Sequence, residues 1–170
     1  MTSNDAKFVA AISAARDAEA AWKALDDLAA AVAGHRLFTV MTVDMTAGLV
    51  RRAYSNRPVE YPASGTKPLR GNSGEWFETV FNKRQTFVAN TNAGIAAVFP
   101  DHELIASLGC GSVVNLPIVL EDRLVAAINL LAEAGRYSPE RVAAIESVLP
   151  IPARLSCALA MRFDPIGEPA

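Results

Sequence analysis

The clearest pattern of apolar and polar positions lies between residues 112 and 131. Two apolar runs of strand length, 112–120 and 124–131, are joined by the polar segment Glu121-Asp122-Arg123. A short polar joint between two such runs is typical of a β-hairpin. In the second run both alternating sets of side chains are mostly apolar, so we expect this strand to be covered on both faces. The pattern predicts the central hairpin of a layered α/β domain.

The segment from Asp5 to Ala33 contains neither proline nor glycine, and its apolar residues recur at steps of three and four. This spacing places one apolar stripe on a helix. We expect a single helix over 5–33, capped by Asn4 or Asp5 and ended by Gly34. A helix of about 28 residues is ~42 Å long, more than a small sheet covers. Either part of the stripe contacts another subunit, or the first turns fray.

Strand-like alternation over 36–43 and 48–54 predicts a second hairpin. The next fifteen residues, 55–69, contain three prolines and one glycine, so we expect a long loop without regular structure. Beyond it we expect a helix capped by Ser73, a short strand over 86–89 and short helical turns between 95 and 108.

The last helical region begins at Ser138-Pro139-Glu140, which combines a capping residue, a proline at the first position and an acidic first turn. Pro150 and Pro152 interrupt its apolar pattern. We therefore expect the helix to end at Pro150 and a separate or kinked helical segment to follow from Ala153 to Arg162.

The length of 170 residues predicts one domain over 1–170, made of a helix over 5–33, a sheet region over 36–132 and a helical segment over 138–163. The net charge of −2 and the lack of a basic cluster argue against nucleic-acid binding. The apolar stretches are too short for a membrane span, and the N-terminus has no secretory pattern. We expect a cytoplasmic protein.

A family resemblance rests on the central hairpin. Gly111–Ile118 and Arg123–Leu130 resemble the signature "S-x-x-x-x-P-I, short turn, L-x-G-x-L-x-L" of GAF domains, with Ala126 where the family usually has glycine. Phe87–Asn90 resembles the strand that precedes this signature, and Tyr137–Glu140 resembles the "F-T-P-E/D" start of the last helix.

The resemblance covers about residues 5 to 163 and implies a GAF/PAS-like α/β (α+β) fold, an antiparallel sheet of five or six strands with helices on both faces. GAF domains commonly hold a small molecule between the sheet and the segments covering one side, and many dimerise through their terminal helices. The resemblance thus implies a small-molecule-binding sensory or regulatory module without catalysis, a homodimer with an unidentified ligand. It implies no particular cofactor.

Several GAF subclasses have signatures that this chain lacks. Asn82-Lys83 occurs without the phenylalanine and acid that follow it in cyclic-nucleotide-binding members, and no cysteine or aspartate context resembles that of bilin-binding members. Free methionine-(R)-sulfoxide reductases use several cysteines, of which only Cys110 lies in the corresponding region. Asn129 lies near the position of their active-site acid.

Cys110 lies between Gly109 and Gly111, and glycines permit the close approach of a ligand. Its thiol becomes a nucleophile if a neighbour such as His102 lowers its pKa. The alternative is a small buried side chain at a corner between helix and strand. With Cys157 the sequence has two cysteines, which we expect to be free thiols, and two histidines without the spacing of a metal site.

Asn115 and Asn129 interrupt apolar central strands. A buried amide needs partners, so each either points into a ligand pocket or satisfies loop backbone. Lys67, on the long loop, either attracts an anionic ligand or remains solvated, and Trp76 lines a pocket or fills the core. The candidate ligand-binding residues are Tyr54, Tyr61, Lys67, Trp76, Phe99, His102, Cys110, Ser112, Asn115 and Asn129.

Three functions remain open from the sequence. The first is the noncatalytic small-molecule sensor. The second is a thiol enzyme related to methionine sulfoxide reduction, with Cys110 attacking and Cys157 resolving. The third is a structural module that dimerises or binds a partner through its alanine-rich helix.

Overall fold

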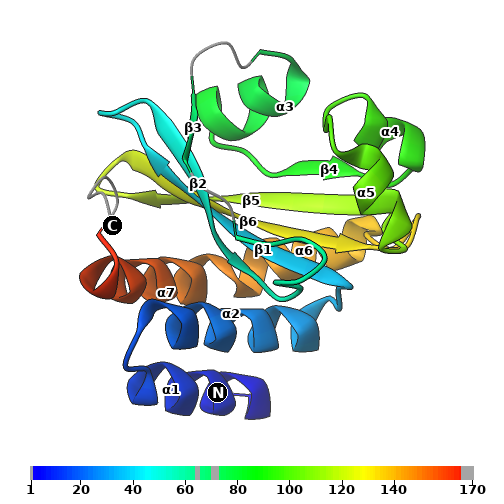
Figure 1. Cartoon of the computed structure of the whole chain (residues 1–170). Helices are drawn as coiled ribbons and strands as arrows, with labels where there is room; N and C mark the ends of the chain where they lie inside the picture. Colours follow the sequence, from blue (N-terminus) through cyan, green and yellow to red (C-terminus); the bar gives the residue numbers. More distant parts are fainter. Residues whose placement is uncertain (1, 64–65, 70–72, 166–170) are drawn as a thin grey trace.

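The computed structural model describes residues 2–63, 66–69 and 73–165. Within these ranges six strands form one antiparallel sheet in the order β3-β2-β1-β6-β5-β4 (Figure 1). The strands are β1 (Leu37–Asp44), β2 (Leu49–Ser55), β3 (Thr66–Pro68), β4 (Phe87–Ala89), β5 (Ser112–Leu120) and β6 (Arg123–Ala132).

Helices lie on both faces of this sheet, so the predicted fold class is confirmed (Figure 1). On one face lie α2 (Ala18–Val32), α6 (Pro139–Val148) and α7 (Pro150–Phe163), with α1 (Ser3–Ala14) packed on the outer side of α2. On the other face lie α3 (Glu75–Phe77), a π-helical turn (Glu78–Asn82), α4 (Asn92–Ala96) and α5 (His102–Ser107).

The central hairpin forms as predicted, with a shorter turn. Only Glu121 and Asp122 connect β5 to β6, because Arg123 already pairs with Leu120. Both turn residues have positive φ, 48° and 57°, as a type I′ hairpin turn requires. The three-residue joint expected from the sequence was therefore one residue too long.

The prediction of a single helix over 5–33 was wrong. The chain leaves the helical conformation after Ala14, and Asp17 begins a second helix by accepting a hydrogen bond from the Ala20 N–H at 2.7 Å. Thr2, with Asp5 in a capping box, begins α1 in place of Asn4 or Asp5. Gly34, with φ of 73°, follows the end of α2 as predicted. The apolar stripe thus folds back on itself, and Phe8 and Ile12 are buried within this chain.

Two expectations for the segment between β2 and α3 were also wrong. The loop over 55–69 contains β3, because Thr66–Pro68 pairs with the exposed edge of β2, where a proline is tolerated. Ser73 does not cap the next helix. Gly74 occupies the position before α3, with φ of 106° and no side-chain hydrogen bond.

The C-terminal region confirms the prediction that proline divides it. Pro150 begins α7, which also contains Pro152, and the axes of α6 and α7 differ by 49°. In the described ranges no single helix has the length and apolar character to cross a membrane, and only this bent pair taken together meets both criteria.

Side-chain alternation along the central strands divides the core in two. One set of alternating side chains, which includes Phe38, Val114 and Leu130, packs against the terminal helices and forms the helical-face core. The other set, which includes Leu37, Val113 and Leu131, faces α3 to α5 and forms the second core. Both faces of the central strands are therefore buried, as the apolar pattern predicted.

Candidate functional site

A cavity of about 560 Å³ lies on the face of the sheet covered by α3 to α5. This volume is in the range of small-molecule pockets. Its floor is formed by β1, β6 and β5, and its walls by α3, the π-helical turn and the segment from α4 to α5. Its described polar and aromatic lining residues are Thr39, Arg51, Arg52, Tyr61, Ser73, Glu75, Trp76, Phe77, Phe81, Phe99, Asp101, Asn115 and Asn129.

A row of polar side chains crosses the cavity floor. Asn115, Asn129 and Thr39 lie directly opposite one another in β5, β6 and β1. Trp76 Nε1 donates to Asn115 Oδ1 at 3.0 Å. Asn115 Nδ2 donates to Asn129 Oδ1 at 2.5 Å, and Asn129 Nδ2 donates to Thr39 Oγ1 at 2.9 Å. We call Thr39, Asn115 and Asn129 the amide row.

The cavity wall is aromatic. The ring centroid of Trp76 lies 5.3 Å from that of Phe81 and 5.9 Å from that of Phe99. Phe77 stacks on Phe81 with centroids 4.7 Å apart. These contacts fix the rings against one another, so their exposed surfaces form a preformed apolar wall.

Charged groups surround the rim. The Arg52 guanidinium lies over the Tyr61 ring, 3.9 Å from its centroid, and 3.9 Å from the Asp101 carboxylate. The Tyr61 hydroxyl donates to Asp101 Oδ2 at 2.5 Å. Burial, followed by this hydrogen bond, raises the pKa of Tyr61, which remains a neutral donor. Arg51 pairs with Asp164 beyond the end of α7. The rim contacts fasten the segment after β2 to the start of α5.

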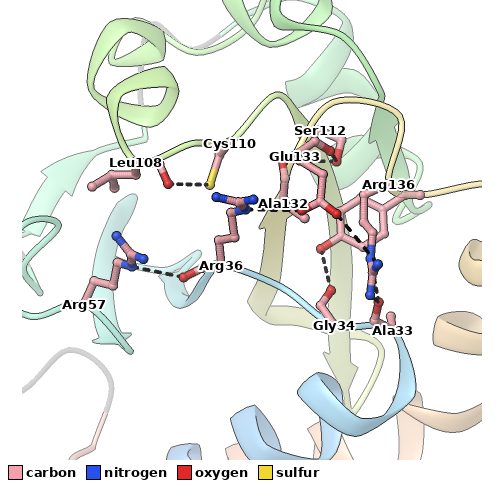
Figure 2. Close-up of polar contacts among 11 residues, drawn as sticks. Ala33, Gly34, Arg36, Arg57, Leu108, Cys110, Ser112, Ala132, Glu133 and Arg136 are labelled. Carbon is pink, nitrogen blue, oxygen red and sulfur yellow. Dashed lines mark hydrogen bonds and ion pairs between the residues drawn. The ribbon is translucent and has the colours of Figure 1, made fainter.

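Cys110 lies in a separate cluster (Figure 2). It is buried, its Sγ is 3.9 Å from the Leu108 carbonyl oxygen, and it does not line the cavity. Burial raises the pKa of its thiol, against a lowering effect of Arg57 and Arg36. Figure 2 shows Arg57 donating to the Arg36 carbonyl and Arg36 donating to Glu133, at 3.1 Å and 3.2 Å.

This cluster does not have the form of an activated thiol site. His102, the candidate neighbour for lowering the pKa of Cys110, is not among the described charged groups that shift the pKa of the thiol. Ser112 is buried beside this cluster and donates to the Glu133 carbonyl oxygen at 2.7 Å. Cys110 belongs to the core on the cavity side and Cys157 to the helical-face core, and both are free thiols. The sheet separates them, so Cys157 is not placed to resolve a disulfide with Cys110.

Tyr54 lies on the opposite face of the sheet from the cavity. Its hydroxyl donates to Asp26 Oδ2 at 2.9 Å, and Asp26 Oδ1 lies 2.7 Å from His35 Nε2. The side chains of His35 and Asp26 are only 3% and 8% exposed. We call Asp26, His35 and Tyr54 the buried triad. Burial, followed by the charge of Asp26, raises the pKa of Tyr54.

The structure thus brings part of the predicted set together. Tyr61, Trp76, Phe99, Asn115 and Asn129 line the cavity. The described lining does not include Tyr54, His102, Cys110 or Ser112. Lys67 lies in β3, and its side chain is outside what the structure describes.

Sequence reasoning missed Thr39, Arg52 and Asp101 as lining residues. Thr39 had a usable signal, because it alternates with apolar residues in β1 and shares its face with Leu37 and Met41. The sequence around Arg52 and Asp101 contains no such signal, because only tertiary packing brings their two segments together at the cavity.

The buried phenols and thiols predict a loss of stability at alkaline pH. Burial raises the pKa of Cys157 to about 12 and also raises the pKa of Tyr54, Tyr61 and Tyr137. Each group keeps its proton in the folded state at a pH where the unfolded chain releases it. This stabilisation is complete below the unfolded pKa and is lost as pH rises through the folded value.

The free energy of unfolding should therefore be nearly constant up to about pH 8 and fall above about pH 9, by up to about 1.4 kcal/mol per pH unit for each group. Urea unfolding followed by circular dichroism across this range measures the slope. Cys157→Ala should reduce the slope. A free energy that stays flat to about pH 10.5 would contradict the expectation.

The antiparallel sheet is covered on both faces and has a cavity between it and the helices on one face, which is the arrangement expected of a GAF domain. The model of the GAF domain family matches residues 11–150, and the chain belongs to this family. No curated protein gives a significant sequence match.

Solved structures of GAF domains share the fold at low sequence identity. The GAF domain of a phosphoenolpyruvate-protein phosphotransferase from Acinetobacter superposes with a TM-score of 0.68 at 9% identity, over 94% of this chain and 93% of that one. The corresponding domain from Coxiella burnetii gives 0.67 at 12% identity, over 94% and 92%. The phycoerythrobilin-bound GAF domain of a cyanobacterial phytochrome gives 0.64 at 13% identity, over 94% of each chain.

Proposed function

We propose that the protein is a small-molecule-binding sensory or regulatory domain without catalytic activity, and that its ligand binds in the cavity on the amide row. The observation that carries this proposal is the row itself. Three polar side chains in register on central strands form part of the floor of a cavity of about 560 Å³, in a sheet that is otherwise apolar there. Polar groups at the bottom of an apolar pocket are typical of ligand recognition.

The chemistry of the described lining supports binding without catalysis. It includes neither cysteine nor histidine, and the Asp101 carboxylate is occupied by Tyr61 and Arg52. An acid–base or nucleophilic mechanism needs such a group within hydrogen-bond reach of a reacting atom. The phytochrome relative, which carries phycoerythrobilin, supports the use of this fold for holding a small molecule.

Thermal denaturation with panels of nucleotides, amino-acid derivatives, organic acids and tetrapyrroles tests the proposal. A ligand at 100 times its Kd should stabilise the protein by about 2.7 kcal/mol. The cavity-filling variant Val113→Phe should lose this stabilisation, because Val113 lines the cavity. Val88→Phe, at an exposed position on β4, is the matched control and should keep it. No shift with any panel, together with no retained compound in native mass spectrometry, would contradict the proposal.

The homodimer is part of the same proposal. Ile151 and Leu155 on α7 are 76% and 47% exposed and lie four residues apart, so they share one side of the helix. An exposed apolar pair on a terminal helix supports a contact with a second copy. Light scattering should show a dimer that the double change of Ile151 and Leu155 to glutamate converts to a monomer. A monomeric wild-type protein at the same concentration would contradict this part of the proposal.

A further inference from the structure

We infer that the cavity binds a neutral, flat aromatic compound carrying a carbonyl-type acceptor, with that acceptor placed against the amide row. This inference rests on the proposed function and adds the chemical class of the ligand. It follows from the direction of the hydrogen bonds in the row, the aromatic wall and the ion pairs that the rim arginines already make.

Trp76 determines the direction of the hydrogen bonds. An indole N–H only donates, so the amide group that faces Trp76 Nε1 must be the oxygen of Asn115. The amide nitrogen of Asn115 then faces Asn129, which must present its own oxygen. The amide nitrogen of Asn129 therefore faces Thr39, whose hydroxyl oxygen accepts. The three bonds of the row run one way, from Trp76 to Thr39.

With this direction, some N–H and O–H hydrogens of the amide row have no acceptor within the row. Each asparagine amide has two N–H hydrogens, and the row uses one of them. The Thr39 hydroxyl oxygen accepts from Asn129 and keeps its own hydrogen. A ligand that covers the row excludes the water that would satisfy these donors. A buried donor without a partner costs about 1–3 kcal/mol, so the ligand should provide an acceptor such as a carbonyl oxygen.

The wall and the rim narrow the class further. Trp76, Phe81 and Phe99 present fixed ring surfaces, against which a flat ring makes more contact than an aliphatic chain of equal size. At the rim, both lining arginines already have carboxylate partners, Arg52 in Asp101 and Arg51 in Asp164. An anionic ligand would have to displace one of these carboxylates to offset its desolvation. A neutral ligand is therefore favoured over an anionic one.

Three probes of the same ring system separate these requirements. 2-Naphthamide is neutral and has the acceptor, 2-methylnaphthalene lacks the acceptor, and 2-naphthoate has it on an anion. Equilibrium dialysis should give 2-naphthamide a Kd about tenfold lower than that of either other probe, which corresponds to 1.4 kcal/mol. Equal or tighter binding of 2-methylnaphthalene overturns the acceptor requirement, and equal or tighter binding of 2-naphthoate overturns neutrality.

Nuclear magnetic resonance places the probe. The indole N–H signal of Trp76 and the side-chain amide signals of Asn115 and Asn129 should shift on addition of 2-naphthamide. The indole signal of Trp22, which belongs to the helical-face core, is the internal control and should not move. Shifts at Trp22 without shifts at Trp76 would place the probe elsewhere and overturn the inference.

Substitution in the row provides the final test. Asn129→Leu should weaken 2-naphthamide binding about tenfold and should not weaken 2-methylnaphthalene binding, because it replaces the donors of Asn129 by an apolar side chain of similar size. Thr39→Val, a change at the end of the row, serves if Asn129→Leu does not fold. Unchanged 2-naphthamide affinity in the folded variant contradicts the inference.

If no naphthyl probe binds while a compound of the metabolite panel does, the ligand class is wrong and the proposed function stands. If nothing binds, both fail.

Discussion

The variant Asp26→Ala is expected to lower the free energy of unfolding by about 3–5 kcal/mol. Asp26 is the acceptor that joins the buried triad, and its removal leaves the Tyr54 hydroxyl and His35 Nε2 without this partner. The other ring nitrogen of His35 already lacks a hydrogen bond among the described residues. The imidazole would then lose its anchoring contact in a site closed to water, where unsatisfied polar groups are most costly.

The neighbouring residue provides a matched control. Asp27 is 65% exposed at its side chain and pairs only across one helical turn with Lys23, which is 57% exposed. Asp27→Ala should therefore change the free energy of unfolding by less than about 1 kcal/mol. Urea unfolding followed by far-ultraviolet circular dichroism measures both variants. Equal effects of the two substitutions would show that the triad does not stabilise the fold.

Leu130→Ala is expected to lower the free energy of unfolding by about 2–5 kcal/mol, the second large effect. Leu130 is fully buried in β6, faces the terminal helices and pairs directly with Phe38 on β1 and Val114 on β5. Its truncation leaves a cavity in the helical-face core, where neighbouring strands hold the backbone in place. Because its side chain points away from the cavity, the affinity of the folded variant for 2-naphthamide should stay unchanged.

Leu104→Ala is the control for this prediction. Leu104, on α5, is 42% exposed, so the same truncation removes less buried surface and leaves no enclosed void. We expect Leu104→Ala to lower the free energy of unfolding by less than about 1 kcal/mol, measured by the same denaturation experiment. A loss for Leu130→Ala as small as that for Leu104→Ala would contradict the assignment of Leu130 to a well-packed core.

Alternation along the central strands could be predicted from the sequence, and it located two of the three residues of the amide row, Asn115 and Asn129. Asn115 and Asn129 interrupt long apolar runs, and a period of two places them on the face of Val113 and Leu131. The same reasoning could not place Tyr54. A register shift between Val40 and Met41 changes the pairing of β1 with β2, so that Tyr54 pairs with Val40 and faces the helices. Such irregularities depend on the partner strand.

The glycines around Cys110 show a second limit. Their sequence context suggested the close approach of a ligand, but protein atoms occupy that space. A Cβ at Gly111 would overlap Asn92 Oδ1 and the Cβ of Ala134, and Gly109 has φ of 77°, where α5 gives way to β5. The break at Asp17 was similarly hidden, because an alanine-rich segment favours a helix on both sides of it.

The Arg51 side chain joins two parts of the domain that are far apart in the sequence. Its guanidinium pairs with Asp164, just past the end of α7. The residues on either side of it in β2, Val50 and Arg52, line the cavity. One strand therefore both borders the cavity and anchors the C-terminal end of the last helix.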